Sequence, residues 1–312
     1  RPPTIPILVI ATALVAGCVA DSGDEPASAP ESDAWVDLFN GEDLTGWVPK
    51  IRGEPLGEDA RGTFRVEDGL LSVSYDQYDA AVGFDDTFGH LFYVDPLDGY
   101  ELLVEYRFVG RQFAGGPGWA RSNSGVMFHA QAPETMGVDQ DFPISLEAQF
   151  LGGAADEVRP TANLCTPGTH VDMSGEQVTQ HCVNASAPTI ADSTWVSVTI
   201  MAYPDGAVRH VIDGQTVIEY QRPVVGGGEV SERTAGAPPE GTALLGGYVA
   251  LQSESHPIQF RRVAIRPLPL AAEADAVVKW GEGVETFRQQ ARRELDAQDM
   301  SHEDLQEEPY VN

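Results

Sequence analysis

Short segments of alternating apolar and polar residues follow one another along the middle of this chain, with no helical pattern between them. The clearest is residues 143–152, Pro-Ile-Ser-Leu-Glu-Ala-Gln-Phe-Leu-Gly. Successive side chains of a β-strand point to opposite faces, so this segment predicts a strand with one oily and one polar face. Parallel sheets need a crossover connection between strands, and the chain has no helical segment to supply one. We therefore predict an all-β fold, an antiparallel sandwich whose oily faces pack together.

Further strands are predicted on both sides of that segment. Residues 64–75 form a predicted hairpin closed by Glu-Asp-Gly, and the Gly-rich stretches 110–122 and 225–241 are predicted loops. Residues 273–298 instead repeat apolar side chains at three- and four-residue steps, which predicts one C-terminal amphipathic helix. The remaining predicted strands are residues 91–94, 100–109, 123–129, 195–202, 208–213, 216–220, 248–253 and 258–267.

The N-terminal segment resembles the export signal of bacterial lipoproteins. Residues 5–16 are an apolar run too short to span a bilayer as a mature helix. The run ends in Leu-Val-Ala-Gly-Cys, which resembles a lipobox, the sequence cleaved before a lipid-bearing cysteine. An ordinary secretory peptide with an incidental cysteine is the alternative. The predicted domains are 1–18, the signal peptide with Cys18 as the lipidated residue; 19–33, a flexible acidic tether; 34–268, the sandwich; and 269–312, the C-terminal helix and acidic tail.

Export determines the expected location and the state of the cysteines. The resemblance implies a protein held at the membrane by the lipid on Cys18, and Val19 after it favours the outer membrane, facing the periplasm or the cell surface. In an oxidising compartment, Cys165 and Cys182 are expected to form a disulfide that pins the long excursion of residues 153–188. Two cysteines and two histidines at this spacing match no zinc motif.

Net charge and missing motifs exclude several function classes. The formal net charge of −29 argues against nucleic acid as a partner, because phosphates would be repelled. The sequence carries no phosphate-binding loop after a strand, no G-x-S-x-G elbow and no H-E-x-x-H motif.

The polar faces of several predicted strands carry groups suited to a sugar. Amides and carboxylates bind hydroxyl groups, and an aromatic ring packs on the C–H face of a sugar ring. We therefore expect a small carbohydrate as the ligand of an exposed sheet face. The outward positions are Glu105 and Arg107; Asn123, Met127 and His129; Glu147 and Gln149; and Tyr248 and Gln252.

Four motifs follow one another along the chain: Leu-Phe-Asn-Gly-Glu-Asp-Leu-Thr-Gly-Trp at 38–47, Asn-Ser-Gly-Val from Asn123, Glu-Ala-Gln from Glu147, and Gly-Tyr-Val-Ala-Leu-Gln from 247 followed by His256 and Phe-Arg-Arg-Val from 260. Together they resemble the 3-keto-disaccharide hydrolase domain, also called the domain of unknown function 1080. The resemblance spans residues 34–268 and implies a concanavalin A-like jelly roll acting on sugars oxidised at C3. The chain departs from the family pattern at Arg262, at Asp213-Gly214 and in the length of residues 153–188.

A ketone at C3 acidifies the C2 proton, so one base can remove that proton and expel the substituent at C1; water then adds to the enone-like product. This route needs a base, a group that polarises the ketone and an acid for the leaving oxygen. A divalent metal bound by Glu147 and a histidine is left open as a cofactor, and His210 is expected to be buried. The hypothesis takes Glu147 as the base, Arg107 as the polarising group and His129 or His256 as the acid, with Asn123, Gln149, Tyr248 and Gln252 binding the substrate.

Ordinary retaining hydrolysis is disfavoured by the strand around Glu147. It requires two carboxylates about 5 Å apart, and this strand supplies one. Two other classes of function stay open: a glycan-binding module without catalysis, and an envelope-anchored structural protein that uses the C-terminal helix. A buried carboxylate at the sugar site would favour the enzyme over the binding module.

Overall fold

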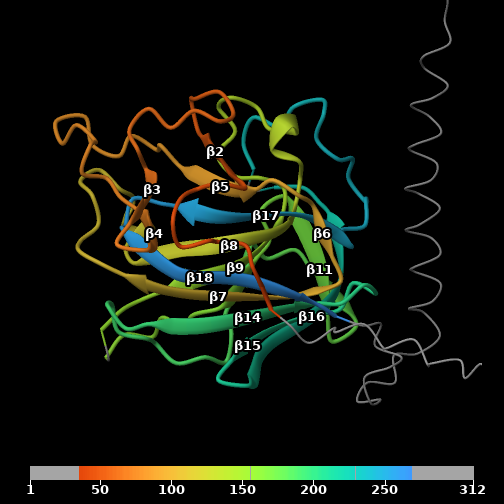
Figure 1. Ribbon diagram of the computed structural model, residues 1–312. Helices are drawn as coiled ribbons and strands as arrows, with labels where there is room; N and C mark the ends of the chain where they lie inside the picture. Colours follow the sequence, from red (N-terminus) through yellow and green to blue (C-terminus); the bar gives the residue numbers. More distant parts are fainter. Residues whose placement is uncertain (1–34, 155, 229, 269–312) are drawn as a thin grey trace, which may run out of the picture. The chain divides into compact units, whose positions relative to one another are not determined.

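The computed structural model describes residues 35–154, 156–228 and 230–268. They form two antiparallel sheets packed face to face (Figure 1). The predicted all-β, concanavalin A-like jelly-roll sandwich is confirmed. The predicted signal peptide, Cys18, the tether and the C-terminal helix lie outside the described residues. Within the described part of the chain, we find no helix with the length and apolar character needed to cross a membrane.

Ten strands form the first sheet, in the order β12-β11-β16-β15-β14-β7-β18-β4-β3, with β1 beside β18. Eight strands form the second, in the order β13-β10-β9-β8-β17-β5-β2, with β6 beside β17. The ten-stranded sheet comprises β1 Val36–Asp37, β3 Phe64–Glu67, β4 Leu70–Val73, β7 Tyr100–Phe108, β11 Thr169–Met173, β12 Glu176–Val178, β14 Val196–Ala202, β15 Val208–Ile212, β16 Gln215–Val225 and β18 Ile258–Pro267. The eight-stranded sheet comprises β2 Trp47–Ile51, β5 Gly89–Tyr93, β6 Leu97–Asp98, β8 Asn123–Ala130, β9 Leu146–Leu151, β10 Asn163–Cys165, β13 Cys182–Val183 and β17 Gly246–Ser253.

The core lies between the sheets and follows the predicted alternation. On β9, the apolar side chains of Leu146, Ala148 and Phe150 are fully buried against the other sheet. The ring of Phe150 stacks on Tyr106 of β7, with ring centroids 4.1 Å apart. Because these two rings belong to different sheets, their contact fixes which face of β9 points inward. The opposite face of β9, which carries Glu147, therefore points away from the core.

The predicted hairpin at residues 64–75 is confirmed as β3 and β4. Its two turn residues, Asp68 and Gly69, have φ angles of 52° and 74°. Positive φ at both central positions is the twist that a two-residue hairpin requires, and aspartate followed by glycine tolerates it best. The turn sequence therefore sets the register of this hairpin.

The excursion at residues 153–188 is more ordered than the sequence predicts. It forms four short strands, of which β10 and β13 extend the eight-stranded sheet and β11 and β12 extend the ten-stranded sheet. The predicted disulfide between Cys165 and Cys182 is confirmed, and the two cysteines are direct partners in the β10–β13 pair. The excursion therefore widens both sheets at one end of the sandwich.

Candidate functional site

A cavity of about 770 Å³ lies over the polar face of the eight-stranded sheet. We expected this face to be exposed, but the two Gly-rich loops cover part of it. The first, residues 110–122, contributes Trp119, and the second, residues 225–241, contributes Val230 and Ser231. The other residues of the lining are Asn123, Asp141, Phe142, Glu147, Gln149, Leu151, Arg159, Cys165, Pro167, His181, Cys182 and Glu254.

Glu147 lies on the floor of this cavity, where the sequence places the catalytic base. Its side chain is only 5% exposed. A methyl group at Gly125 of the neighbouring strand β8 would lie 2.5 Å from Glu147 Oε1. The carboxylate can therefore lie flat over β8 only because residue 125 has no side chain.

A second buried carboxylate, Glu254, lines the same cavity and was missed by the sequence reasoning. It directly follows β17 and is 3% exposed. A signal for it exists in the sequence, since Glu254 is two residues beyond Gln252 and so shares its side of the strand. The two carboxylates come together because β8 alone separates β9 from β17. The strand of Glu147 supplies one carboxylate, as the sequence indicates, and the second carboxylate of the site comes from the end of β17.

The two carboxyl groups are electrostatically coupled. Burial raises the pKa of Glu147, and burial together with the nearby charge of Glu147 raises the pKa of Glu254 well above its usual value. Among the described residues, no lysine or arginine forms an ion pair with either carboxylate. Perturbed carboxyl groups in a cavity are typical of catalytic or ligand-binding centres.

Two of the predicted sugar-binding amides line the cavity beside Glu147. Gln149 accepts a hydrogen bond from Asn163 Nδ2 at 3.0 Å, which leaves its own amide nitrogen as a donor. Asn123 donates through Nδ2 to the carbonyl oxygen of Trp119 at 3.4 Å. The other two predicted sugar-binding residues lie outside the lining. Gln252 is fully buried, and Tyr248 packs against the cluster that contains Met127.

Trp119 is a second residue that the sequence reasoning missed. It comes from the short 3-10 helix Gly118–Ala120 and is 54% exposed, although it is a large apolar side chain. Its ring stacks on Phe88, with centroids 5.9 Å apart and planes 14° apart. A partly exposed, rigidly stacked indole at a cavity offers a flat surface for a sugar ring.

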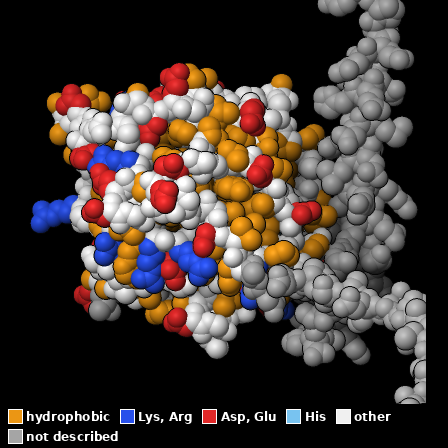
Figure 2. Space-filling view, viewed as in Figure 1, with side chains coloured by type: hydrophobic (Ala, Val, Ile, Leu, Met, Phe, Trp, Pro, Cys, Tyr) orange, Lys and Arg blue, Asp and Glu red, His pale blue; other side chains and the backbone are white. Residues whose placement is uncertain are grey.

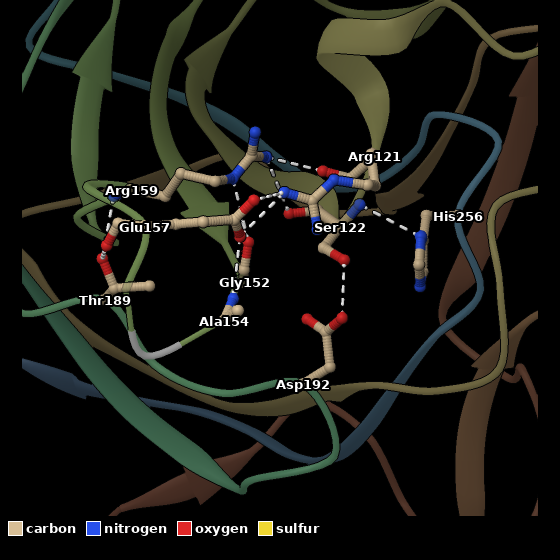
Figure 3. Close-up of polar contacts among 9 residues, drawn as sticks. All are labelled: Arg121, Ser122, Gly152, Ala154, Glu157, Arg159, Thr189, Asp192 and His256. Carbon is tan, nitrogen blue, oxygen red and sulfur yellow. Dashed lines mark hydrogen bonds and ion pairs between the residues drawn. The ribbon is translucent and has the colours of Figure 1, made fainter.

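Arg159, from the excursion, is the arginine that lines the cavity. Its guanidinium donates to the carbonyl oxygens of Gly152 at 2.9 Å and Arg121 at 2.6 Å (Figure 3). Neighbouring Glu157 forms its ion pair with Arg121 instead. Burial, and then the charge of Arg121, lower the pKa of Arg159. The backbone therefore holds this cation in place without a carboxylate partner in hydrogen-bond contact.

Arg107 does not belong to this site, so the proposed role in polarising a ketone is corrected. It lies on β7 of the ten-stranded sheet, where it donates to Gln259 and its guanidinium lies 4.7 Å from the ring centroid of Trp195. Figure 2 shows arginine and acidic side chains close together around β18 and β7, where Arg261 pairs with Glu105. Alternation predicted that Arg107 faces outward, but it could not tell which sheet carries the strand.

His129 also lies away from the cavity, and a bulge in β8 explains why. Its φ angle is 48°, and two residues of β8 face one residue of β17 between the pairs Tyr248–Ala130 and Ala250–Met127. This bulge reverses the side to which the next side chain points. The His129 ring packs against Tyr100, at 6.0 Å between centroids, and its Nδ1 lies 3.0 Å from the carbonyl oxygen of Leu244. The role of His129 as an acid is corrected accordingly.

His256 lies beside the site but is not part of the cavity lining. Its Nδ1 accepts a hydrogen bond from the backbone N–H of Ser122 at 3.0 Å (Figure 3). Its ring packs on Phe108. Burial lowers its pKa, which favours the neutral ring. His256 therefore supports the start of β8 and is not placed as an acid for a leaving group. His210, in contrast, is fully buried as predicted.

A metal bound by Glu147 and a histidine was left open from the sequence, and this pair is not part of any group of three candidate ligands in the described part of the chain. One group of three candidate ligands appears there: Cys165, His181 and Cys182. Both of these sulfur atoms are already bonded to each other, so they are not available as thiolates. The oxygen-bearing side chains around Glu147 and Glu254 are the remaining candidates for a cation.

Comparisons with solved structures give distant likenesses. A Parabacteroides distasonis protein described as a candidate glycosyl hydrolase is 21% identical, with a TM-score of 0.45, covering 77% of this chain and 96% of its own. A carbohydrate binding module from Bacillus subtilis is 10% identical, with a TM-score of 0.38, covering 71% and 95%. A Bacillus licheniformis β-glucanase is 11% identical, with a TM-score of 0.39, covering 75% and 97%. These likenesses are too distant to bear on function. No curated protein matches the sequence.

One family model matches the greater part of the sequence. The model of the 3-keto-alpha-glucoside-1,2-lyase-like domain covers residues 34–266, which is most of the chain and all of the sandwich except its last described residues. The cavity with its two carboxylates lies within that match. The chain therefore belongs to the 3-keto-alpha-glucoside-1,2-lyase-like domain family and is a carbohydrate-active protein.

Proposed function

We propose that this protein is an enzyme that cleaves the glycosidic bond of 3-keto-glycosides or 3-keto-disaccharides. The observation that carries the proposal is the buried carboxylate of Glu147, held on the floor of a sugar-sized cavity next to Glu254. Membership of the 3-keto-alpha-glucoside-1,2-lyase-like family supports the choice of an oxidised sugar as the substrate.

In the proposed reaction, Glu147 takes the proton from C2 of the sugar. The C2–H electron pair moves toward C3, and an enolate forms at the C3 oxygen. When the C1–O bond breaks, the C3 ketone re-forms, a C1–C2 double bond appears, and the proton on Glu147 passes to the leaving oxygen. Water then adds across the new double bond, its oxygen to C1 and a proton to C2. A single carboxyl group can serve first as the base and then as the acid when the C2–H bond and the C1–O bond both lie on its side of the sugar ring.

The other residues of the cavity bind and orient the substrate. The amides of Asn123 and Gln149 are placed to form hydrogen bonds with sugar hydroxyl groups. The indole of Trp119 is placed to stack on the sugar ring. Arg159 supplies a fixed positive charge at the same cavity, the role that the sequence reasoning gave to Arg107. Fixed charges and donors of this kind lower the barrier because they need no rearrangement during the reaction.

A second candidate is ordinary hydrolysis of unoxidised glycosides, which the two carboxylates favour. One would serve as acid and the other as nucleophile or base. A glycan-binding module is less well supported, because its site would not need two carboxylates buried at a cavity floor.

The deciding experiment incubates the full chain with a 3-keto-glucoside and with the matching unoxidised glucoside, and follows release of the aglycone. We expect the protein to cleave the 3-keto-glucoside and not the unoxidised glucoside. We expect Glu147→Gln to abolish this cleavage. Turnover of the unoxidised glucoside would favour the second candidate. Saturable binding of glycan with no cleavage of either substrate would make the protein a binding module.

We also propose that the protein works outside the cytoplasm, anchored through a lipid on Cys18. The disulfide between Cys165 and Cys182 supports an oxidising compartment. Mass spectrometry of the protein from its native membrane, before and after Cys18→Ser, tests the anchor: the wild-type N-terminal peptide should carry acyl chains and that of the variant should not.

A further inference from the structure

Six polar atoms around the carboxylate pair are buried without a hydrogen-bond partner among the described residues. They are Oδ1 of Asn123, Oε1 and Nε2 of Gln252, Oε2 of Glu254, Nε2 of His90, which pairs with Gln252 across the strands, and Oγ of Ser231, which lines the cavity. Gln252 is fully buried, and Asn123 and Glu254 are each 3% exposed. Buried polar atoms in folded proteins nearly always have a partner, so a cluster of unpartnered ones indicates that a ligand supplies it.

The strand register brings these side chains to one place. Leu251 of β17 pairs with Val126 of β8, so the next residue, Gln252, falls beside Gly125. Glu147 Oε1 lies over this same Gly125. Glu254 is two residues farther along and points to the same side, toward the cavity that it shares with Asn123 and Glu147. The unpartnered oxygens therefore converge next to Glu147.

The two carboxyl groups of this cluster have no cationic side chain as a partner within the described part of the chain. No arginine or lysine in the described ranges forms an ion pair with Glu147 or Glu254. The fixed cation of the cavity, Arg159, is occupied by backbone carbonyl oxygens. Removing a charge from water without a partner is costly, so a bound positive charge would stabilise this arrangement.

We propose that Glu254, Gln252 Oε1 and Asn123 Oδ1 bind one divalent cation beside Glu147, with Asn123 and Glu254 in the cavity lining and Gln252 buried beside Gly125. All three donors are oxygens, the ligands that Mg²⁺, Ca²⁺ and Mn²⁺ prefer, and none is sulfur or imidazole. This inference rests on the proposed function and deepens it: the cation would bind the C3 oxygen and stabilise the enolate that forms when Glu147 takes the C2 proton. Glu147 remains free to act as the base.

The test measures binding directly on the full chain after dialysis against EDTA. Calorimetric titration with Mg²⁺, Ca²⁺ and Mn²⁺ should give one saturable site for at least one of them, and that ion should raise the melting temperature. Terbium(III), a probe for oxygen-ligand sites, should give indole-sensitised emission, because Trp119 lines the same cavity. Trp119→Phe should reduce that emission while calorimetric binding of the cation is retained.

Glu254→Gln and Gln252→Leu should each weaken binding by at least about ten-fold. Glu176→Gln, an exposed acid on β12, removes the same charge elsewhere and should leave binding unchanged. Two substitutions keep the test informative if one of them fails to fold, as judged by its thermal transition. Absence of saturable binding, or equal binding in wild type and both variants, would overturn the proposal.

The cation site and the proposed function can fail separately. If EDTA-treated protein binds no cation yet still cleaves a 3-keto-glucoside, the function stands and the cation site is wrong. If the cation binds at this site but no 3-keto substrate is cleaved with it present, the site stands and the proposed reaction is wrong.

Discussion

The carboxylate of Glu147 lies over Gly125 of strand β8, and Glu254, at the end of β17 on the other side of β8, is close enough for the charge of Glu147 to raise its pKa. Two buried carboxylates side by side repel each other, and burial penalises the charge of each. A pair of buried apolar residues would serve the fold better at these positions. Retention of the pair at a cavity is therefore best explained by what it binds or does.

Replacing either carboxylate should reduce catalysis without unfolding the protein. We expect Glu147→Gln to lower kcat on a 3-keto-glucoside by about 10²–10⁴-fold, the usual contribution of a general base, and Glu254→Gln to lower it as well. Neither change should lower the melting temperature, since a neutral amide is easier to bury than a carboxylate. Steady-state kinetics and thermal unfolding check this, with Glu176→Gln as the exposed control. Full activity in Glu147→Gln would exclude it as the base.

Gly125→Ala should disturb the site mainly through Glu147, with a weaker contact to the backbone oxygen of Ala148 at 3.1 Å. The new methyl group would lie 2.5 Å from Glu147 Oε1 and 2.9 Å from its Cγ, so the carboxylate must move. Because a displacement of about 1 Å can cost about 10²-fold in rate, we expect a loss of that order in kcat, with an overpacking cost of about 1–3 kcal/mol in stability. Gly227→Ala is the matched control, since the nearest atom to its methyl group would be 3.8 Å away. Unchanged kinetics in Gly125→Ala would show that the carboxylate does not act from this position.

Trp119→Ala should weaken substrate binding more than it slows the chemical step. The indole is 54% exposed at the cavity, stacks on Phe88 and has no proton to exchange with the substrate in the proposed reaction. Loss of a stacking surface worth about 1.4 kcal/mol would raise KM about ten-fold while kcat changes little. Val158→Ala, at a side chain that is 91% exposed, gives a control for the loss of surface apolar area. A fall in kcat at unchanged KM would instead place Trp119 in the reaction.

Much of the fold was predictable because it depends on local patterns. Alternation on β9 identified which side chains enter the core, and Asp68-Gly69 identified a hairpin through the backbone angles that it allows. The same alternation placed Glu147 on the polar face, and the disulfide followed from the predicted oxidising compartment.

The errors arise where a long-range or non-periodic feature decides the outcome. Alternation says that Arg107 points outward, but the pairing of β7 with β14 and β18 decides that it lies on the other sheet. The bulge at His129 breaks the two-residue period within a single strand. Glu254 stands just past the end of β17, and its proximity to Glu147 depends on the order of three strands. Single-strand periodicity contains none of this information.

The contribution of His210 to the free energy of unfolding should fall as pH decreases from 7 to 5, because this buried histidine is held neutral. His210 is fully buried, with Nδ1 at 2.9 Å from the carbonyl oxygen of Ala162 and Nε2 at 2.9 Å from the hydroxyl of Tyr220. Burial lowers the pKa of His210 to about 4, against a usual value near 6.5 in the unfolded chain. A lowered histidine pKa means that the unfolded chain takes up the proton first, so stability is lost as pH falls through this range.

The expected loss from this one histidine is about 2 kcal/mol in the free energy of unfolding between pH 7 and pH 5. Urea denaturation at the two pH values measures it. His210→Gln, which keeps a hydrogen-bonding side chain but cannot titrate, should reduce the pH dependence by that amount. Arg209→Gln, at the adjacent outward-facing position of β15, serves as the control and should leave the pH dependence unchanged. An identical pH dependence in wild type and His210→Gln would contradict the assignment of a neutral His210.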